Sequence, residues 1–161
     1  GTLSGSAKFL KEKNPNIKVI GVDASGSILK GFHETGKINE DEIHPYQIEG
    51  MGKNLIPGAL LFDKVDEFVR VNDEMAAYRT REIALKEAIM GGYTTGAVTQ
   101  GLLQYANSRE FSKDDVIVAI YPDHGSRYIT KVYSDEWMAE QGFINNCVHN
   151  YDEVFKTEII S

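Results

Sequence analysis

The sequence predicts an α/β fold in which a mostly parallel sheet is flanked by helices, giving three layers. Residues 17–22 and 116–121 are short, β-branched and nearly all apolar, as are strands buried on both faces of a parallel sheet. Residues 65–71 alternate apolar and polar side chains, which predicts a strand with one wetter face at the edge of the sheet. One predicted helix before the first of these runs and two after the 65–71 strand complete the α/β pattern.

The composition is that of one globular domain, with 161 residues, 42% of them hydrophobic and 25% charged. The net charge of −7 argues against a nucleic-acid partner, because phosphate binding needs clustered Lys and Arg. Neither a run of about 18 apolar residues nor a signal peptide is visible, so we expect no membrane partner and a cytoplasmic location. The single cysteine, Cys147, excludes an internal disulfide and a cysteine-based zinc site.

The first element is a helix that begins within residues 1–7 and ends at residues 14–16, where Pro15 disfavours helical geometry at Asn14. Its start is rich in glycine, threonine and serine and has no basic side chain. Free amides and the positive end of the helix dipole make such a start an anion site, held by amides and hydroxyls. The alternative is that small residues simply let a helix begin.

A turn at residues 23–27 and a long polar connection at 31–46 follow the first strand. The connection contains two of the histidines, His33 and His44. Their spacing fits no metal-ligand motif, so we expect no metal site.

A short strand is predicted at residues 46–49, directly before Gly50 and Gly52. Two glycines separated by one residue after a strand indicate that the backbone approaches a ligand closely. A plain tight turn is the alternative. The edge strand at 65–71 comes next.

Two helices follow, from 74 to about 90 and from 97 to about 107, and the polar sequence 91–96 joins them. The apolar residues expected to face the core from the first of these helices are Met75, Ala76, Tyr78, Ile83, Ala84, Leu85 and Ala88. The junction places hydroxyl groups where they can reach a ligand. Alternatively, it is a helix–helix turn that a threonine caps.

Polar residues at 122–127 lie at the carboxyl end of the predicted strand 116–121, where open α/β sheets bind their ligands. Helical segments are expected at about 128–132 and 134–141. From residue 145 the chain is polar with scattered apolar positions.

Five motifs now stand in a fixed order. They are GTLSG at 1–5, EGMG at 49–52, GYTTG at 92–96, PDHGSRY at 122–128 and YSDEWM at 133–138. Together they closely resemble the cystathionine β-synthase and cysteine synthase family, whose members are pyridoxal 5′-phosphate (PLP) enzymes of fold type II. The resemblance covers residues 1–143. It implies that residues 1–144 are the carboxyl-terminal part of a catalytic core, an incomplete large domain, and that 145–161 are a polar tail or the start of a linker.

The resemblance implies a set of residues that bind the cofactor, namely Gly1, Thr2, Gly50, Thr94 and Asp123. Thr2 would bond the PLP phosphate, and Gly50 would lie near the cofactor ring. Thr94 matches the hydroxyl that bonds the pyridine nitrogen, and Asp123 matches a residue that orders the groups around that nitrogen. A neutral hydroxyl there leaves the nitrogen unprotonated, which favours elimination and addition at Cβ.

The residues expected near the substrate are Glu49, Gly52, Lys53 and Tyr93. Two of them depart from the family. Tyr93 is bulky where the family usually has glycine. Lys53 stands where several members carry an aromatic or acidic residue, so it could change which thiol is accepted.

The implied activity is the PLP-dependent condensation of L-serine with homocysteine to cystathionine, a transsulfuration step. One alternative is a cysteine synthase that uses O-acetylserine and sulfide. An alternative of another class is a non-catalytic interaction or regulatory half-domain. The family also implies a homodimer.

The Schiff-base lysine of the family lies upstream of Gly1 in the matching order, and none of the lysines of this chain stands in its motif. The expectation is therefore that no catalytic residue lies within these 161 residues, that they are inactive alone, and that the amino-terminal half is a partner.

Overall fold

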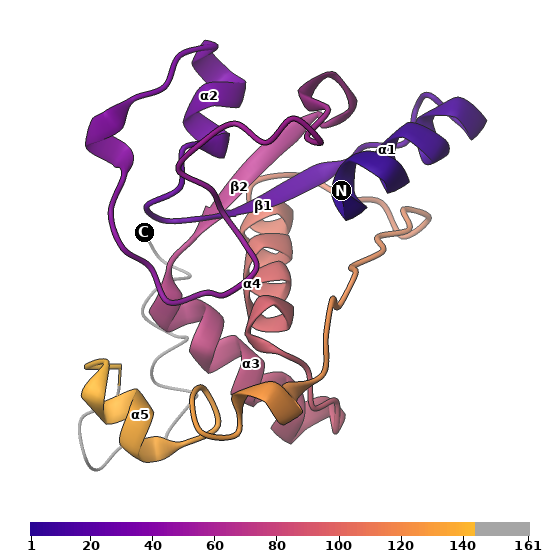
Figure 1. The fold of residues 1–161 in the computed structure, drawn as a ribbon. Coiled ribbons are helices and arrows are strands. Elements are labelled where there is room, and N and C mark those ends of the chain that lie inside the picture. The colour runs from indigo at the N-terminus through magenta and orange to yellow at the C-terminus, as the bar shows by residue number, and fades with distance from the viewer. Residues whose placement is uncertain (144–161) are drawn as a thin grey trace.

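The computed structural model describes residues 1–143 (Figure 1). The helices and strands are α1 (Thr2–Lys13), β1 (Ile20–Ala24), α2 (Leu29–Thr35), β2 (Glu67–Val71), α3 (Asp73–Glu87), α4 (Tyr93–Asn107) and α5 (Asp135–Glu140). Three short 3₁₀ helices complete the set, η1 (Glu40–Glu42), η2 (Phe62–Lys64) and η3 (Gly125–Tyr128). Residues 144–161, which include Cys147 and the predicted tail, lie outside the described part.

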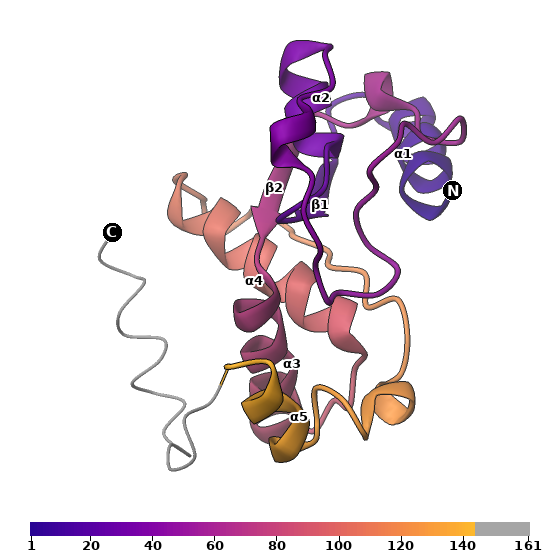
Figure 2. The ribbon, with the colours of Figure 1, turned by 60° about the vertical axis from the view of Figure 1, so that its left-hand side comes forward.

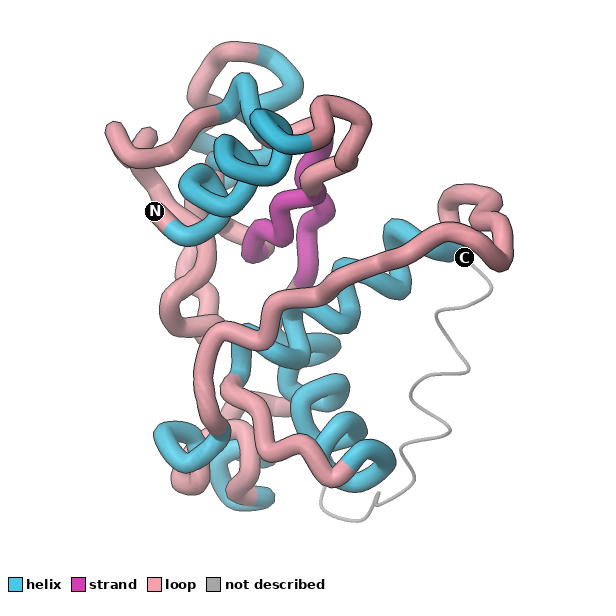
Figure 3. The backbone as a smooth tube through the Cα atoms, turned by 90° about the vertical axis from the view of Figure 1, so that its right-hand side faces the viewer, coloured by secondary structure: helices cyan, strands magenta, loops and turns pink. Residues whose placement is uncertain are grey.

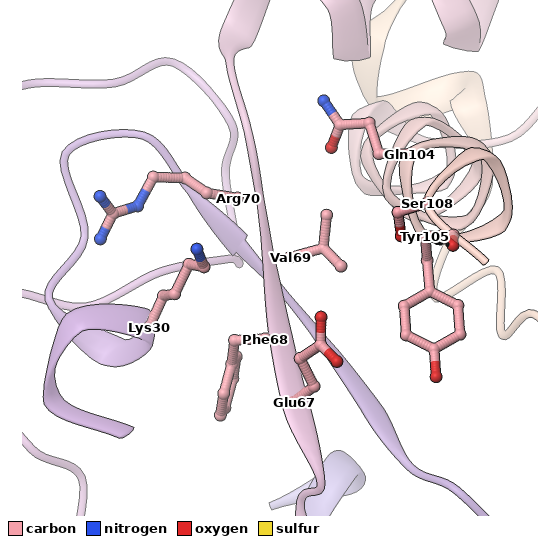
Figure 4. A pocket seen from close by; sticks show the side chains of 8 residues that line it. All are labelled: Lys30, Glu67, Phe68, Val69, Arg70, Gln104, Tyr105 and Ser108. Carbon is pink, nitrogen blue, oxygen red and sulfur yellow. Dashed lines mark hydrogen bonds between the residues drawn. The ribbon is translucent and has the colours of Figure 1, made fainter. Parts of the chain in front are cut away.

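Two parallel strands form the sheet of the described residues, with Ile20 opposite Glu67 and Ala24 opposite Val71. Helix α4 packs against both strands and α2 packs against β2. Because α2 and α4 lie on either side of β2, the three layers are helix, sheet and helix (Figure 4). This confirms the α/β fold with a parallel sheet flanked by helices.

The main core lies where α3 and α4 cross and pack against each other (Figure 2). Its buried members are Ile48, Val71, Ala76, Ala77, Tyr78, Tyr93, Ala97, Tyr128, Val132 and Met138. Gly96 brings the two helices close, because a Cβ at this position would overlap the Ala76 carbonyl and lie 2.6 Å from the Thr80 amide nitrogen. A smaller cluster around Leu29, Val65 and Phe68 joins α2 to β2 and to η2.

The helix limits follow local signals. Helix α1 ends at Lys13, as Pro15 predicts, and the Asn72 side chain caps α3 by accepting the Met75 amide at 2.8 Å. Helix α3 ends at Glu87, earlier than predicted, because Ala88 takes the left-handed conformation with φ 56°. The inward positions predicted for Leu85 and Ala88 are wrong, since both side chains are exposed, Leu85 by 69%.

Other limits depend on contacts distant in sequence. The first strand begins at Ile20 rather than at residue 17, because its pairing with β2 fixes its limits. The polar connection predicted at 31–46 is partly ordered into α2 and η1. The helical segment predicted at 134–141 appears as α5. The one predicted at 128–132 is wrong, because the 3₁₀ helix η3 ends at Tyr128 and residues 129–132 form turns.

Two predicted strands are wrong. Residues 46–49 form no strand, since the Gln47 and Ile48 amides donate to the Asp73 carboxylate instead. Residues 116–121 also form no strand, because none of the described strands pairs with them. Their side chains are largely exposed, Val116 by 87% and Val118 by 80%. Strand propensity alone does not make a strand without a partner. Within residues 1–143, no helix is both long and apolar enough to cross a membrane.

Candidate active site

The first turn of α4 and the loop before η3 form a polar junction that holds two predicted cofactor residues, Thr94 and Asp123. An isolated antiparallel bridge joins Gly91 to His124, and the Gly92 amide donates to the Asp123 carbonyl at 2.8 Å. These backbone bonds bring together two segments that lie about 30 residues apart in sequence, and they do so without the strand at 116–121 that the sequence predicted.

The Asp123 carboxylate organises this junction. One oxygen accepts the Tyr128 hydroxyl at 2.9 Å, and the Thr94 hydroxyl donates to the other at 3.4 Å. Burial and the neighbouring carboxylate raise the pKa of Tyr128 to about 12, so its hydroxyl stays protonated and remains a donor. A Cβ at Gly92 would overlap the Asp123 carboxylate, which explains why a glycine precedes Tyr93.

Tyr93 lies in the core beside this junction. Its side chain is fully buried, and its ring contacts Tyr128 and Trp137 edge to face. Its hydroxyl donates to the main-chain carbonyl of Asp73 at 2.8 Å. Its predicted place near the substrate stays a prediction, and in this structure its side chain acts through packing and this hydrogen bond.

The turn at residues 49–53 carries four predicted site residues. Gly50 and Gly52 have φ of 81° and 69°, a conformation that favours glycine, so the two-glycine motif has a backbone reason. Glu49, Gly50 and Lys53 are exposed, and Glu49 forms an ion pair with Lys131. The Lys53 peptide is held by Ser27, whose Oγ accepts the Lys53 amide at 2.9 Å.

Gly1 and Thr2 are exposed at the beginning of α1, and no side chain within residues 1–143 caps this helix. The first amides of a helix have no partner within the helix, so they remain available to an anion, and the anion site stays a prediction. In Figures 1 and 2 the beginning of α1 lies well away from the first turn of α4. The structure therefore brings Thr94 and Asp123 together and leaves Gly1 and Thr2 apart from them.

The chemistry of the α4 junction is compatible with the cofactor. The Thr94 hydroxyl is a neutral donor with a single hydrogen, which it gives to the Asp123 carboxylate at 3.4 Å. A pyridine nitrogen that stays unprotonated is an acceptor, so bound PLP would take this hydrogen in place of Asp123. The hydroxyl oxygen of the adjacent Thr95 is buried and has no hydrogen-bond partner in the described part of the chain, so a donor or acceptor at the start of α4 is left unpaired. Among residues 1–143, no three His, Cys, Asp or Glu side chains are grouped as metal ligands.

Four residues that the sequence reasoning did not nominate support the site: Ser27, Asp73, Tyr128 and Lys131. Tyr128 closes the PDHGSRY motif and follows Asp123 by five residues, which is a usable signal. The other three contact the 47–53 segment from distant parts of the chain. No local pattern marks such contacts.

A pocket of about 260 Å³ lies elsewhere, at the edge of β2 that faces away from β1 (Figure 4). Its lining residues are Lys30, Glu67, Phe68, Val69, Arg70, Gln104, Tyr105 and Ser108. None of the predicted site residues lines it, so this pocket is distinct from the α4 junction.

The class of this protein follows from sequence comparison, which agrees with the α/β fold. The family model described as "Pyridoxal-phosphate dependent enzyme" matches residues 1–123, and the chain belongs to this family. The family depends on PLP, which confirms the predicted cofactor.

The particular relatives are mostly cystathionine β-synthases. The chain is 34% identical to the cystathionine β-synthase of Saccharomyces cerevisiae over 139 residues, covering 86% of this chain and 27% of that protein. It is 32% identical to an N-(2-amino-2-carboxyethyl)-L-glutamate synthase of Cupriavidus metallidurans over 140 residues, covering 86% and 38%.

Among solved structures, an O-acetylserine dependent cystathionine β-synthase from Helicobacter pylori superposes with a TM-score of 0.67 at 33% identity. The match covers 81% of this chain and 39% of that one. These comparisons confirm the resemblance to cystathionine β-synthases. The chain spans about a quarter to two fifths of the length of these proteins.

Proposed function

We propose that this chain is part of a PLP-dependent β-replacement enzyme that condenses L-serine with homocysteine to cystathionine. The observation that carries the proposal is the 34% identity to the Saccharomyces cerevisiae cystathionine β-synthase over 86% of this chain. The Thr94 hydroxyl beside the Asp123 carboxylate at the start of α4 supports it. Bound PLP would supply an electron sink for the amino acid. A neutral partner for its ring nitrogen suits replacement at Cβ better than reactions that need a stronger sink.

The residues of this chain would bind and orient. Thr94 would donate its hydroxyl hydrogen to the pyridine nitrogen and give up its 3.4 Å bond to Asp123, while Tyr128 keeps Asp123 in place beside it. Gly1 and Thr2 would hold the phosphate with amides and a hydroxyl. The exposed turn with Gly50 would lie beside the amino acid.

Thr94 variants of the full-length protein test this assignment. We expect Thr94→Ser to keep PLP affinity and activity, because it keeps the hydroxyl. Thr94→Ala should lower kcat/KM by about tenfold, the effect of one lost hydrogen bond. Equal kcat/KM values for the two variants would show that the Thr94 hydroxyl does not bind the cofactor.

Rates with competing substrates test the reaction. Full-length protein should react with homocysteine faster than with sulfide, and serine and O-acetylserine should be compared as donors because the Helicobacter pylori relative is described as O-acetylserine dependent. A tenfold preference for sulfide would instead support the cysteine synthase. Absence of cofactor absorbance after mixing with PLP would support a non-catalytic half-domain.

We also propose that residues 1–161 alone are inactive, because none of their lysines stands in the Schiff-base motif. The amino-terminal half would supply that lysine, and the complete protein would be a cytoplasmic homodimer. β-replacement by the isolated 161-residue polypeptide would contradict the first statement, and sedimentation of full-length protein as a monomer would contradict the dimer.

A further inference from the structure

The turn with Gly50 is fixed at both ends by contacts distant in sequence. After the turn, Ser27 Oγ accepts the Lys53 amide at 2.9 Å, and the Ile28 amide donates to the Lys53 carbonyl at 2.9 Å. Before the turn, the Asp73 carboxylate accepts the Gln47 amide at 2.7 Å and the Ile48 amide at 3.1 Å. Because this segment forms no strand, these bonds replace the sheet pairing that would otherwise hold it.

Asp73 differs from Ser27 because it also contacts α4. Its main-chain carbonyl accepts the Tyr93 hydroxyl at 2.8 Å, and Tyr93 directly precedes Thr94. Asp73 is the first residue of α3, the helix that crosses α4 and packs against it (Figures 1 and 2). The side chain of one residue therefore holds the turn while its main chain holds the start of α4.

The packing makes this link rigid. Tyr93 and Ile48 are both fully buried in the main core, so neither end of the link is free to shift toward solvent. Hydrogen bonds to a carboxylate are also stronger than those between neutral groups. A displacement of the turn relative to Thr94 would have to break these bonds.

We infer that Asp73 is a positioning residue that couples the Gly50 turn to the Thr94 end of the site, with the Tyr93 hydroxyl as the second member of the link. The inference rests on the proposed function, because it takes the turn to lie beside the amino acid. It gives Tyr93 a role at the position where the family usually has glycine.

The test uses full-length holoenzyme with Asp73→Asn, Tyr93→Phe and the double variant. Hydrogen exchange of residues 47–53 reports the turn, and titration with L-serine followed by cofactor absorbance reports amino-acid affinity. Asp73→Asn should speed exchange at Gln47 and Ile48 and weaken L-serine binding, each by about tenfold. Tyr93→Phe should act in the same direction, and its effect should shrink in the Asp73→Asn background.

The matched control is Asn72→Ala, which removes the cap of the same helix without touching the turn. It should lower Tm and leave L-serine affinity unchanged. Unchanged exchange in Asp73→Asn, faster exchange with unchanged L-serine affinity, or additive effects in the double variant would each overturn the inference. Failure of the proposed function shows separately, because the parent holoenzyme would then give no response to L-serine.

Discussion

Asp23 shows how burial acts on a single residue at the carboxyl end of β1. Its side chain is fully buried, and one of its oxygens accepts the Lys30 amide at 3.0 Å. Burial raises the pKa of Asp23 above its ordinary value of 3.8, although hydrogen bonds and the nearby Arg70 oppose the rise. The ionised carboxylate is therefore less favourable in the folded protein than in the unfolded chain.

The raised pKa of Asp23 makes the free energy of unfolding depend on pH. A carboxyl group whose folded pKa is raised stabilises the fold below pH 3.8, and the stabilisation is lost as the pH rises through the folded pKa. We expect Asp23→Asn to remove this loss while keeping an acceptor for the Lys30 amide. In urea titrations from pH 4 upward, the stability of the parent should therefore fall relative to the variant. A constant difference across that range would contradict the shift.

At the scale of elements, the contact between α3 and α4 depends on Gly96. The backbones approach so closely that a Cβ there would overlap the Ala76 carbonyl and the Thr80 hydroxyl. This contact positions the first turn of α4, and hence Thr94, against the start of α3. Gly5 in α1 is the opposite case, since a Cβ there would meet nothing within 4 Å.

Gly96→Ala should destabilise the protein by about 2 kcal/mol or more, because the helices must separate to admit the methyl group. Gly5→Ala is the control. It should be neutral or stabilising by up to about 1 kcal/mol, since alanine favours a helix more than glycine does. Urea unfolding measures both variants. Similar effects at the two positions would mean that the helix contact at Gly96 is looser than the structure shows.

At the scale of the whole molecule, residues 116–121 are a strand sequence without a strand partner among residues 1–143. The segment exposes Val116 and Val118 almost entirely, and Ile117 and Ile120 by about half. Contiguous apolar surface of this kind marks an interaction site or an aggregation hazard. Because the relatives are much longer than this chain, we propose that polypeptide outside residues 1–143 covers the segment.

Substitution of Val118 by Lys should therefore have opposite effects in two contexts. In the 161-residue chain it should raise solubility without lowering Tm, because Val118 packs against little. In full-length protein it should lower Tm, since a charge would be buried in the completed sheet. Leu85→Lys, on the exposed face of α3, should be harmless in both. A harmless Val118→Lys in full-length protein would show that the segment stays exposed.

The sequence by itself determined what depends on neighbouring residues and on motif order. It predicted the end of α1 at Pro15, the glycines of the turn at residues 50–52, the edge strand, and the family with its cofactor. Proline and glycine restrict or widen the backbone angles at and next to their own positions, so their effect can be predicted locally. The order of motifs along a chain can likewise be recognised from the sequence alone.

Only the tertiary structure decided which distant groups meet. Asp73 binds the Gln47 and Ile48 amides where a strand was predicted, and Tyr93 lies in the core. Residues 116–121 have strand propensity but no described partner. The physical reason is that a backbone amide needs an acceptor, and the sequence does not say whether a strand or a buried carboxylate will supply it.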